Sequence, residues 1–371
     1  MPVCLNSIPA MLDTSPLARW LCNDRPLEAK ESSDRCLRIG LINNMPDGAL
    51  EATENQFISL LDSASDGIPI RFAFYSMPGV PRSESGARHV KSFYSSTQDL
   101  LNTQLDGLIV TGREPVTPSL RDEPYWQSFA EILEWARDNT YSTVWSCLAA
   151  HAAVLHLDGI ERVRSNNKHC GVFECEQLSR HQLTYGTPLG FALPHSRWNG
   201  LSEAELMDCG YSVLTRAGAA GVDTFVKQLK SLFVFFQGHP EYESNTLLLE
   251  YRRDVGRYLR GETDRYPSMP YRYFDRSTVK MLEKFREEAI SRPDDGLLGR
   301  VCTALGKIRI ENSWHTTAGS IYRSWLQYIC AQKERHLERS NFVPLGHATL
   351  SLSPILASSD DAAASPAPCE A

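Results

Sequence analysis

The stretch "YSTVWSCLAAHAAVLHL", residues 141–157, joins a β-branched and aromatic run to an alanine-rich run, with Cys147 at the junction. The first run predicts a buried strand and the second a helix, so the stretch predicts one unit of an α/β fold. Unpaired backbone N–H groups and the helix dipole would favour a thiolate on Cys147. Taken alone, however, a free cysteine is more often a small buried packing residue.

The same alternation of apolar runs and helical patterns extends over residues 36 to about 260. It predicts an α/β fold with a doubly wound, mostly parallel sheet. We expect strands at residues 37–43, 70–76, 105–112, 142–146, 210–216 and 231–238, and helices at residues 52–63, 125–139, 148–157 and 246–261. Residues 261–340 form a helical pattern that we expect to pack on the sheet, which gives one domain over residues 36–340.

Composition narrows the class of protein. The chain has 371 residues, of which 42% are hydrophobic, and a net charge of −7. That charge disfavours nucleic acid and anionic membranes as partners. The sequence contains neither a membrane-spanning run nor a signal-peptide pattern, so we expect a cytoplasmic protein. Residues 1–35 and the Ala/Ser/Pro-rich residues 341–371 are predicted to be a flexible segment and a disordered tail outside the fold.

A second predicted strand end changes the interpretation of Cys147. The run "SLFVFFQGHPEYE", residues 231–243, places His239 and Glu241 directly after an aromatic strand. Pro240 favours an extended backbone at His239, and residues two apart in an extended segment point the same way. Because the carboxyl ends of parallel strands meet at one edge of a sheet, we expect the three side chains to lie together. A thiol, an imidazole and a carboxylate form the usual set for nucleophilic acyl transfer.

Several motifs in order then give a resemblance. They are "INNMPDGALEATENQF" (42–57), "DGLIVTG" (106–112) with "YW" after it, the cysteine turn, "KHCGVFE" (168–174), "PHSRW" (194–198), "GHPEYESNTLLLEYRRD" (238–254) and "NSWHTTAGSIYRSWLQYI" (312–329). With these motifs the chain resembles the homoserine O-succinyltransferase family. The resemblance implies the fold of the class I glutamine amidotransferases and an acyltransferase activity.

The resemblance also implies roles for individual residues. Cys147 corresponds to the nucleophile, His239 to the general base and Glu241 to the residue that holds the imidazole. Arg253 corresponds to the arginine that binds the acceptor carboxylate. Lys168 and Ser196 correspond to positions that line the substrate pocket. By geometry, the backbone N–H of Leu148 is a natural oxyanion donor, and we expect a second donor near Met45 and Pro46.

The implied reaction moves an acyl group from an acyl-CoA, which is a co-substrate and not a cofactor, to the hydroxyl of L-homoserine in methionine biosynthesis. The acyl group passes through a thioester on Cys147. No metal is expected, because the histidines lack metal-site spacing and His169, Cys170 and Cys175 have no fourth ligand. A homodimer is an assembly state that the sequence leaves open.

The identity of the acyl group depends on the loop after "TG" at residues 111–112. In the family, a glutamate at one position of this loop excludes succinyl-CoA and a glycine admits it. Here that position is Val116, which carries no charge. Arg113 could pair with a succinyl carboxylate, whereas Glu114 would oppose it. We therefore expect succinyl-CoA to be preferred over acetyl-CoA.

The chain also departs from the family pattern, and alternatives stay open. Asp47 and Gly48 replace lysines that usually follow "MP", and residues 276–311 look inserted. L-Serine remains an alternative acceptor, since one methylene discriminates by only about 1–3 kcal/mol. A glutaminase on the same fold would use the same triad, although "WSCLAAH" lacks the glycines that normally flank its nucleophile. A non-catalytic binding protein is the third alternative.

Overall fold

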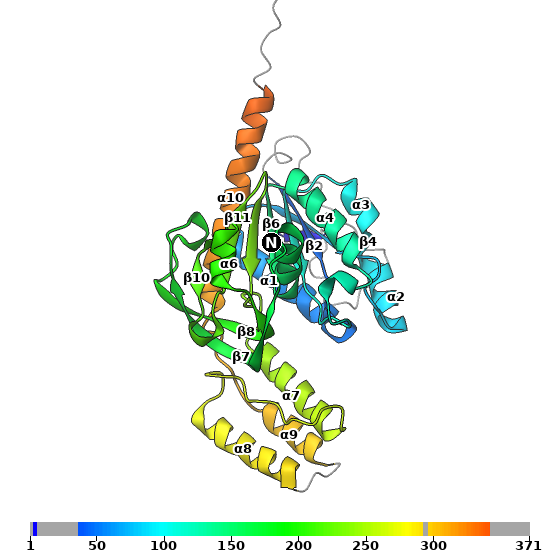
Figure 1. Ribbon diagram of the computed structural model, residues 1–371, viewed down its shortest axis with the longest axis vertical. Helices are drawn as coiled ribbons and strands as arrows, with labels where there is room; N and C mark the ends of the chain where they lie inside the picture. Colours follow the sequence, from blue (N-terminus) through cyan, green and yellow to red (C-terminus); the bar gives the residue numbers. More distant parts are fainter. Residues whose placement is uncertain (1–2, 6–35, 292–295, 342–371) are drawn as a thin grey trace, which may run out of the picture.

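The computed structural model describes residues 3–5, 36–291 and 296–341 (Figure 1). A nine-stranded sheet forms its centre, in the order β1-β3-β2-β5-β6-β12-β11-β9, with β4 paired to β3. Its strands are β1 (Val3–Leu5), β2 (Leu37–Ile42), β3 (Ile70–Ser76), β4 (Ser95–Ser96), β5 (Gly107–Thr111), β6 (Ser142–Ser146), β9 (Ser212–Val213), β11 (Thr224–Gln228) and β12 (Leu232–Phe236). Along this order, every neighbouring pair from β1 as far as β12 is parallel, and so is the pair of β3 and β4. The strand β11 pairs antiparallel with both of its neighbours, β12 and β9.

Helices cover both faces of this sheet, which confirms the predicted doubly wound α/β fold. On one face, α1 (Leu50–Ala64) and α10 (His315–Asn341) pack in the same apolar cluster as strand residues such as Leu41 and Ile109. On the other face, α4 (Trp126–Asn139) and α5 (Leu148–Asp158) contribute to a second cluster around Trp145. Every residue of β5, β6 and β12 is buried, as expected for strands covered on both sides.

A smaller antiparallel sheet was not predicted. It contains β7 (Val163–Gln177), β8 (Gly190–Gly200) and β10 (Thr215–Arg216), in the order β10-β7-β8. The first half of β7 is largely exposed and polar, so it has no apolar run that would mark a strand. The single strand predicted at residues 210–216 is divided, because β9 belongs to the main sheet and β10 to the smaller one.

One expectation about the amino-terminal segment is wrong. Residues 1–35 were expected to lie outside the fold, yet Val3–Leu5 forms β1 and pairs in parallel with β3 at the edge of the main sheet. Val3 and Leu5 are buried in the core. The strand is too short, and its surroundings too polar, to give a sequence signal. The predicted tail at residues 341–371 lies almost wholly outside the described residues.

The helical extension divides into two parts. The helices α8 (Arg276–Ser291) and α9 (Leu297–Leu305) gather around α7 (Thr246–Leu259) in a lobe away from the main sheet, at the lower end of Figure 1. The long helix α10 packs against the sheet, where Trp325 Nε1 donates to Ser142 Oγ at 2.9 Å. The expectation of packing on the sheet is therefore confirmed for α10 and wrong for α8 and α9.

The remaining helices are short. They are α2 (Glu84–Phe93), α3 (Thr97–Leu101) and α6 (Glu203–Asp208). Among the helices in the described ranges, none combines the length and the hydropathy needed to cross a membrane.

Candidate active site

Cys147 occupies a strained turn between β6 and α5. Its φ of 53° and ψ of −112° lie in a region that residues with a side chain rarely adopt. The Cys147 N–H donates to Phe236 O at 2.7 Å, which ties the turn to the end of β12. The side chain is partly exposed, unlike the buried Cys36, Cys170 and Cys175. Strained strand-to-helix turns of this kind present nucleophiles, so the geometry favours the nucleophile interpretation over the packing interpretation.

Gly112 allows the loop after β5 to pass close to this turn. A Cβ atom added at Gly112 would lie 2.5 Å from Leu148 Cβ and 2.6 Å from Ala149 N. Both contacts are too short for real atoms, and the second one is to backbone at the start of α5. A side chain at position 112 would therefore displace the backbone that carries the candidate oxyanion donor.

We predict that Gly112→Ala lowers kcat/KM by about 100-fold, because a displacement of roughly 1 Å at a catalytic group has an effect of that size. Steady-state kinetics with an acyl-CoA and an acceptor would measure it. Gly190→Ala is the matched control, since a Cβ there meets no atom within 4 Å. Equal rates for both variants and the parent protein would show that the close approach has no catalytic importance.

His239 and Glu241 lie together after β12. His239 Nδ1 is 2.8 Å from Glu241 Oε1, both side chains are buried, and the His239 N–H donates to Pro194 O at 2.8 Å. Burial opposes a charge on His239, but Glu241 and Cys147 outweigh it and raise the imidazole pKa well above its ordinary value. Because Nδ1 faces Glu241, Nε2 is left to face Cys147. The arrangement favours an imidazolium at His239, in contact with the Cys147 side chain.

Backbone N–H groups near Cys147 are the candidate donors to the oxyanion. Leu148 is the first residue of α5, so its N–H belongs to the helix start, where no intrahelical acceptor exists. The expected second donor is not found at Met45 or Pro46, because Pro46 has no N–H and Met45 N donates to Asn43 Oδ1 at 3.2 Å. Asp47, which replaces an expected lysine, forms an ion pair with Arg82 at 3.2 Å.

The three residues predicted to bind the amino-acid acceptor, Lys168, Ser196 and Arg253, belong to one charged cluster. Lys168 Nζ lies 3.2 Å from Asp254 Oδ2, and Ser196 Oγ donates to Glu250. Arg253 is more than half exposed, and its guanidinium lies 2.8 Å from Asp254 Oδ1. Burial disfavours the Lys168 ammonium, but Glu250 and then Asp254 raise its pKa.

Tyr242 connects this cluster to the triad. Its ring stacks on that of His239, with centroids 4.2 Å apart, and its hydroxyl donates to Glu250 Oε1 at 2.7 Å. The sequence reasoning missed Tyr242, Glu250 and Asp254. The two acids lie four residues apart on α7 and on either side of Arg253, and this spacing could have indicated them.

The two residues predicted to contact the acyl donor, Arg113 and Val116, lie in the loop after β5. Val116 is exposed, with 62% of its surface accessible. Arg113 Nη1 donates to Pro81 O at 3.0 Å, so its guanidinium contacts the loop that precedes α2.

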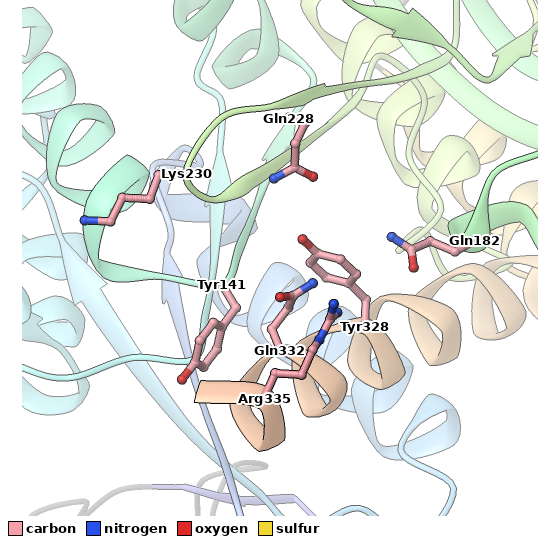
Figure 2. A pocket seen from close by; sticks show the side chains of 7 residues that line it. All are labelled: Tyr141, Gln182, Gln228, Lys230, Tyr328, Gln332 and Arg335. Atoms are coloured by element: carbon pink, nitrogen blue, oxygen red, sulfur yellow. The ribbon is translucent and has the colours of Figure 1, made fainter. Parts of the chain in front are cut away.

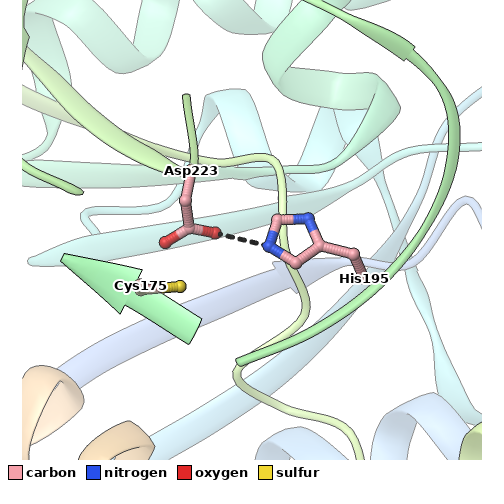
Figure 3. A group of neighbouring side chains, drawn as sticks. All are labelled: Cys175, His195 and Asp223. Atoms are coloured by element: carbon pink, nitrogen blue, oxygen red, sulfur yellow. Dashed lines mark ion pairs between the residues drawn. The ribbon is translucent and has the colours of Figure 1, made fainter. Parts of the chain in front are cut away.

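Cys175, His195 and Asp223 form a buried polar group (Figure 3), and His195 and Asp223 lie against the backbone at Gly238, the residue before His239. His195 Nε2 lies 3.2 Å from Asp223 Oδ1, and Cys175 is close to both. Arg197 Nε donates to His195 Nδ1 at 3.3 Å, which places the imidazole proton on Nε2, facing the carboxylate. Burial lowers the pKa of His195 to about 4, so it is neutral. The neighbouring guanidinium makes an additional cation unfavourable here, and we interpret the group as structural and not as a metal site.

A polar cavity of about 380 Å³ lies elsewhere (Figure 2). Its lining residues are Tyr141, Gln182, Gln228, Lys230, Tyr328, Gln332 and Arg335. Tyr141 precedes β6, whereas Cys147 follows it. The cavity therefore lies at the amino ends of the parallel strands, and the triad lies at their carboxyl ends. It cannot hold a substrate against Cys147.

The chain is similar to several known proteins. A family model described as homoserine O-succinyltransferase matches residues 22–336. The chain is 45% identical to a homoserine O-succinyltransferase from Rhodopseudomonas palustris, over 82% of this chain and 91% of that protein. It is 44% identical to one from Bradyrhizobium japonicum, over 79% and 90%. Among solved structures it is similar to a glutamine amidotransferase from Methylobacillus flagellatus, with 16% identity, a TM-score of 0.44, and coverage of 79% and 95%.

Proposed function

The chain belongs to the homoserine O-succinyltransferase family, and we propose that it transfers a succinyl group from succinyl-CoA to homoserine through a thioester on Cys147. The product serves methionine biosynthesis. The observation that supports this route is the placement of Cys147, at a positive φ, beside a buried His239 that Glu241 orients. A cytoplasmic location remains a prediction from the sequence.

The first half-reaction acylates the enzyme. The Cys147 thiolate attacks the thioester carbonyl of succinyl-CoA, and the Leu148 N–H stabilises the oxyanion that forms. As the tetrahedral intermediate collapses, the bond between the carbonyl carbon and the coenzyme A sulfur breaks. The departing sulfur takes the proton of the His239 imidazolium, so His239 becomes neutral.

The second half-reaction transfers the acyl group. Neutral His239 removes the proton of the homoserine hydroxyl, whose oxygen attacks the Cys147 thioester. The carbon–sulfur bond breaks, and the thiolate and the imidazolium are restored together. Glu241 accepts from Nδ1 throughout, which keeps Nε2 directed at the reacting groups. Arg253 is proposed to bind the acceptor carboxylate, with Lys168 and Ser196 lining the pocket.

We predict that succinyl transfer dominates when succinyl-CoA and acetyl-CoA compete at equal concentration with homoserine. Val116 presents no charge that would repel the succinyl carboxylate, and Arg113 provides a cation in the same loop. Mass spectrometry of the product distinguishes O-succinylhomoserine from O-acetylhomoserine. Arg113→Ala should slow succinyl transfer by about tenfold and leave acetyl transfer unchanged, whereas a dominant acetyl product from the parent protein would contradict the donor assignment.

A further inference from the structure

His151 is a buried histidine that the proposed reaction does not use. It lies on α5, one turn after Cys147, and only 1% of its surface is exposed. Its Nε2 atom lies 2.9 Å from Oε1 of Gln237, which is wholly buried and comes two residues before His239. This side-chain contact therefore joins the helix that follows the nucleophile to the segment that carries the general base.

The hydrogen bonds of Gln237 fix the direction of this contact. The Gln237 Nε2 group donates to Val222 O at 2.7 Å, so Oε1 is the acceptor that faces His151. Burial, followed by the charge of Arg197, lowers the pKa of His151 to about 3, so the imidazole is neutral and has one proton. That proton lies on Nε2. Nδ1 is buried and has no hydrogen-bond partner among the residues that the structure describes.

We propose that His151 is a positioning residue, which through Gln237 holds the general base at the distance from the nucleophile that proton transfer requires. The inference rests on the proposed transferase function. A second contact lies beside this one, since the Cys147 N–H donates to Phe236 O at 2.7 Å. The backbone bond holds the last residue of β12, and the His151 side chain holds the next residue, where the chain leaves the strand toward the base.

Other bonds hold the same segment to different parts of the protein. The Gln237 N–H donates to Asp223 O at 2.9 Å, and the His239 N–H donates to Pro194 O of β8 at 2.8 Å. These bonds fix the segment relative to β8 and the chain before β11, whereas the His151 contact fixes it relative to α5. Without that contact the buried Gln237 Oε1 would lack its donor, which is unfavourable, and the segment would shift relative to α5.

Three substitutions at residue 151 separate the hydrogen bond from packing. The amide nitrogen of glutamine reaches the position of Nε2, whereas that of asparagine reaches only the position of Nδ1. His151→Gln therefore keeps a donor to Gln237, His151→Asn loses it, and His151→Phe loses it but keeps a ring. His156→Phe is the matched control, because His156 lies on the same helix but its Nε2 contacts Glu134 of α4, at 3.0 Å. The rate of Cys147 succinylation by succinyl-CoA is measured for each protein between about pH 6 and 9 by intact-protein mass spectrometry.

We expect His151→Phe and His151→Asn to lower the succinylation rate by about 10- to 100-fold, and His151→Gln and the control to stay within about threefold of the parent protein. Burial opposes the charge on His239, and Glu241 and the contact with Cys147 raise its pKa. A base that is displaced from Cys147 loses part of this effect and gives up its proton at lower pH. The alkaline limit of succinylation should therefore move to lower pH in the two impaired variants.

Equal rates for the Gln and Asn variants would overturn the proposal, because only the reach of the donor differs between them. An alkaline limit that stays in place while the rate falls would also overturn it, since a purely structural role of His151 would not change the protonation of His239. If His151→Phe does not fold, the comparison of the two amide variants still decides. A parent protein that succinyl-CoA does not acylate at Cys147 would instead refute the proposed function, and this role with it.

Discussion

Replacing Cys147 by serine should lower kcat/KM for succinyl transfer by roughly 10⁴-fold, because the residue is the only proposed carrier of the acyl group. A serine hydroxyl is of similar size but is a much weaker nucleophile than a cysteine thiol, so it attacks the donor far more slowly. The thioester intermediate also disappears. Steady-state rates with succinyl-CoA and homoserine measure the loss, and intact-protein mass spectrometry without homoserine detects the succinyl adduct.

Cys209→Ser provides the control for this variant. Cys209 is another partly exposed free cysteine, at the end of α6, and it has no proposed role. This control should retain the parent rate and the adduct. A Cys147→Ser protein that still transfers succinate at the parent rate would show that the acyl group passes directly from coenzyme A to the acceptor.

The sequence predicted the central sheet well where strands are buried on both faces. The strands β5 and β12 are apolar along most of their length, β2 is interrupted only by Arg38, and β6 is rich in β-branched and aromatic residues, so each gives a strong local signal. The small antiparallel sheet escaped prediction because the pairing of β7 with β8 depends on contacts between distant residues and not on hydrophobicity. β1 is only three residues long, and its assignment depends on its pairing with β3.

The candidate site shows a similar division. Cys147, His239 and Glu241 could be predicted because each residue lies directly after a recognisable strand, and parallel strands end at one edge. Gly112 could not be predicted as a contact of the cysteine turn, since its importance is a matter of the distance between two loops. Glu250 is also invisible locally, because its position next to Ser196 and Tyr242 requires the packing of α7 against β8.

Substitution of Glu241 by glutamine should lower kcat/KM by roughly 10³-fold and shift the pH dependence of catalysis. Glu241 raises the pKa of His239, so its loss should let the imidazole lose its proton at a lower pH. Acylation requires the imidazolium as the proton donor to coenzyme A. The alkaline limit of the acylation rate should therefore move to lower pH, while the parent protein keeps its imidazolium to higher pH. Rates of Cys147 succinylation between pH 6 and 9 test this.

Glu243→Gln separates this effect from a general change of charge near the site. Glu243 is two residues away and exposed, so the same substitution there removes one negative charge without touching His239. It should leave the rate within about twofold of that of the parent protein and the pH of the alkaline limit unchanged. If Glu241→Gln slows the enzyme without moving the alkaline limit, Glu241 acts only by orienting the imidazole, and its charge does not stabilise the imidazolium. If neither changes, the assignment of Glu241 to the triad is wrong, because a buried carboxylate 2.8 Å from Nδ1 cannot be neutralised without consequence for a histidine that transfers protons.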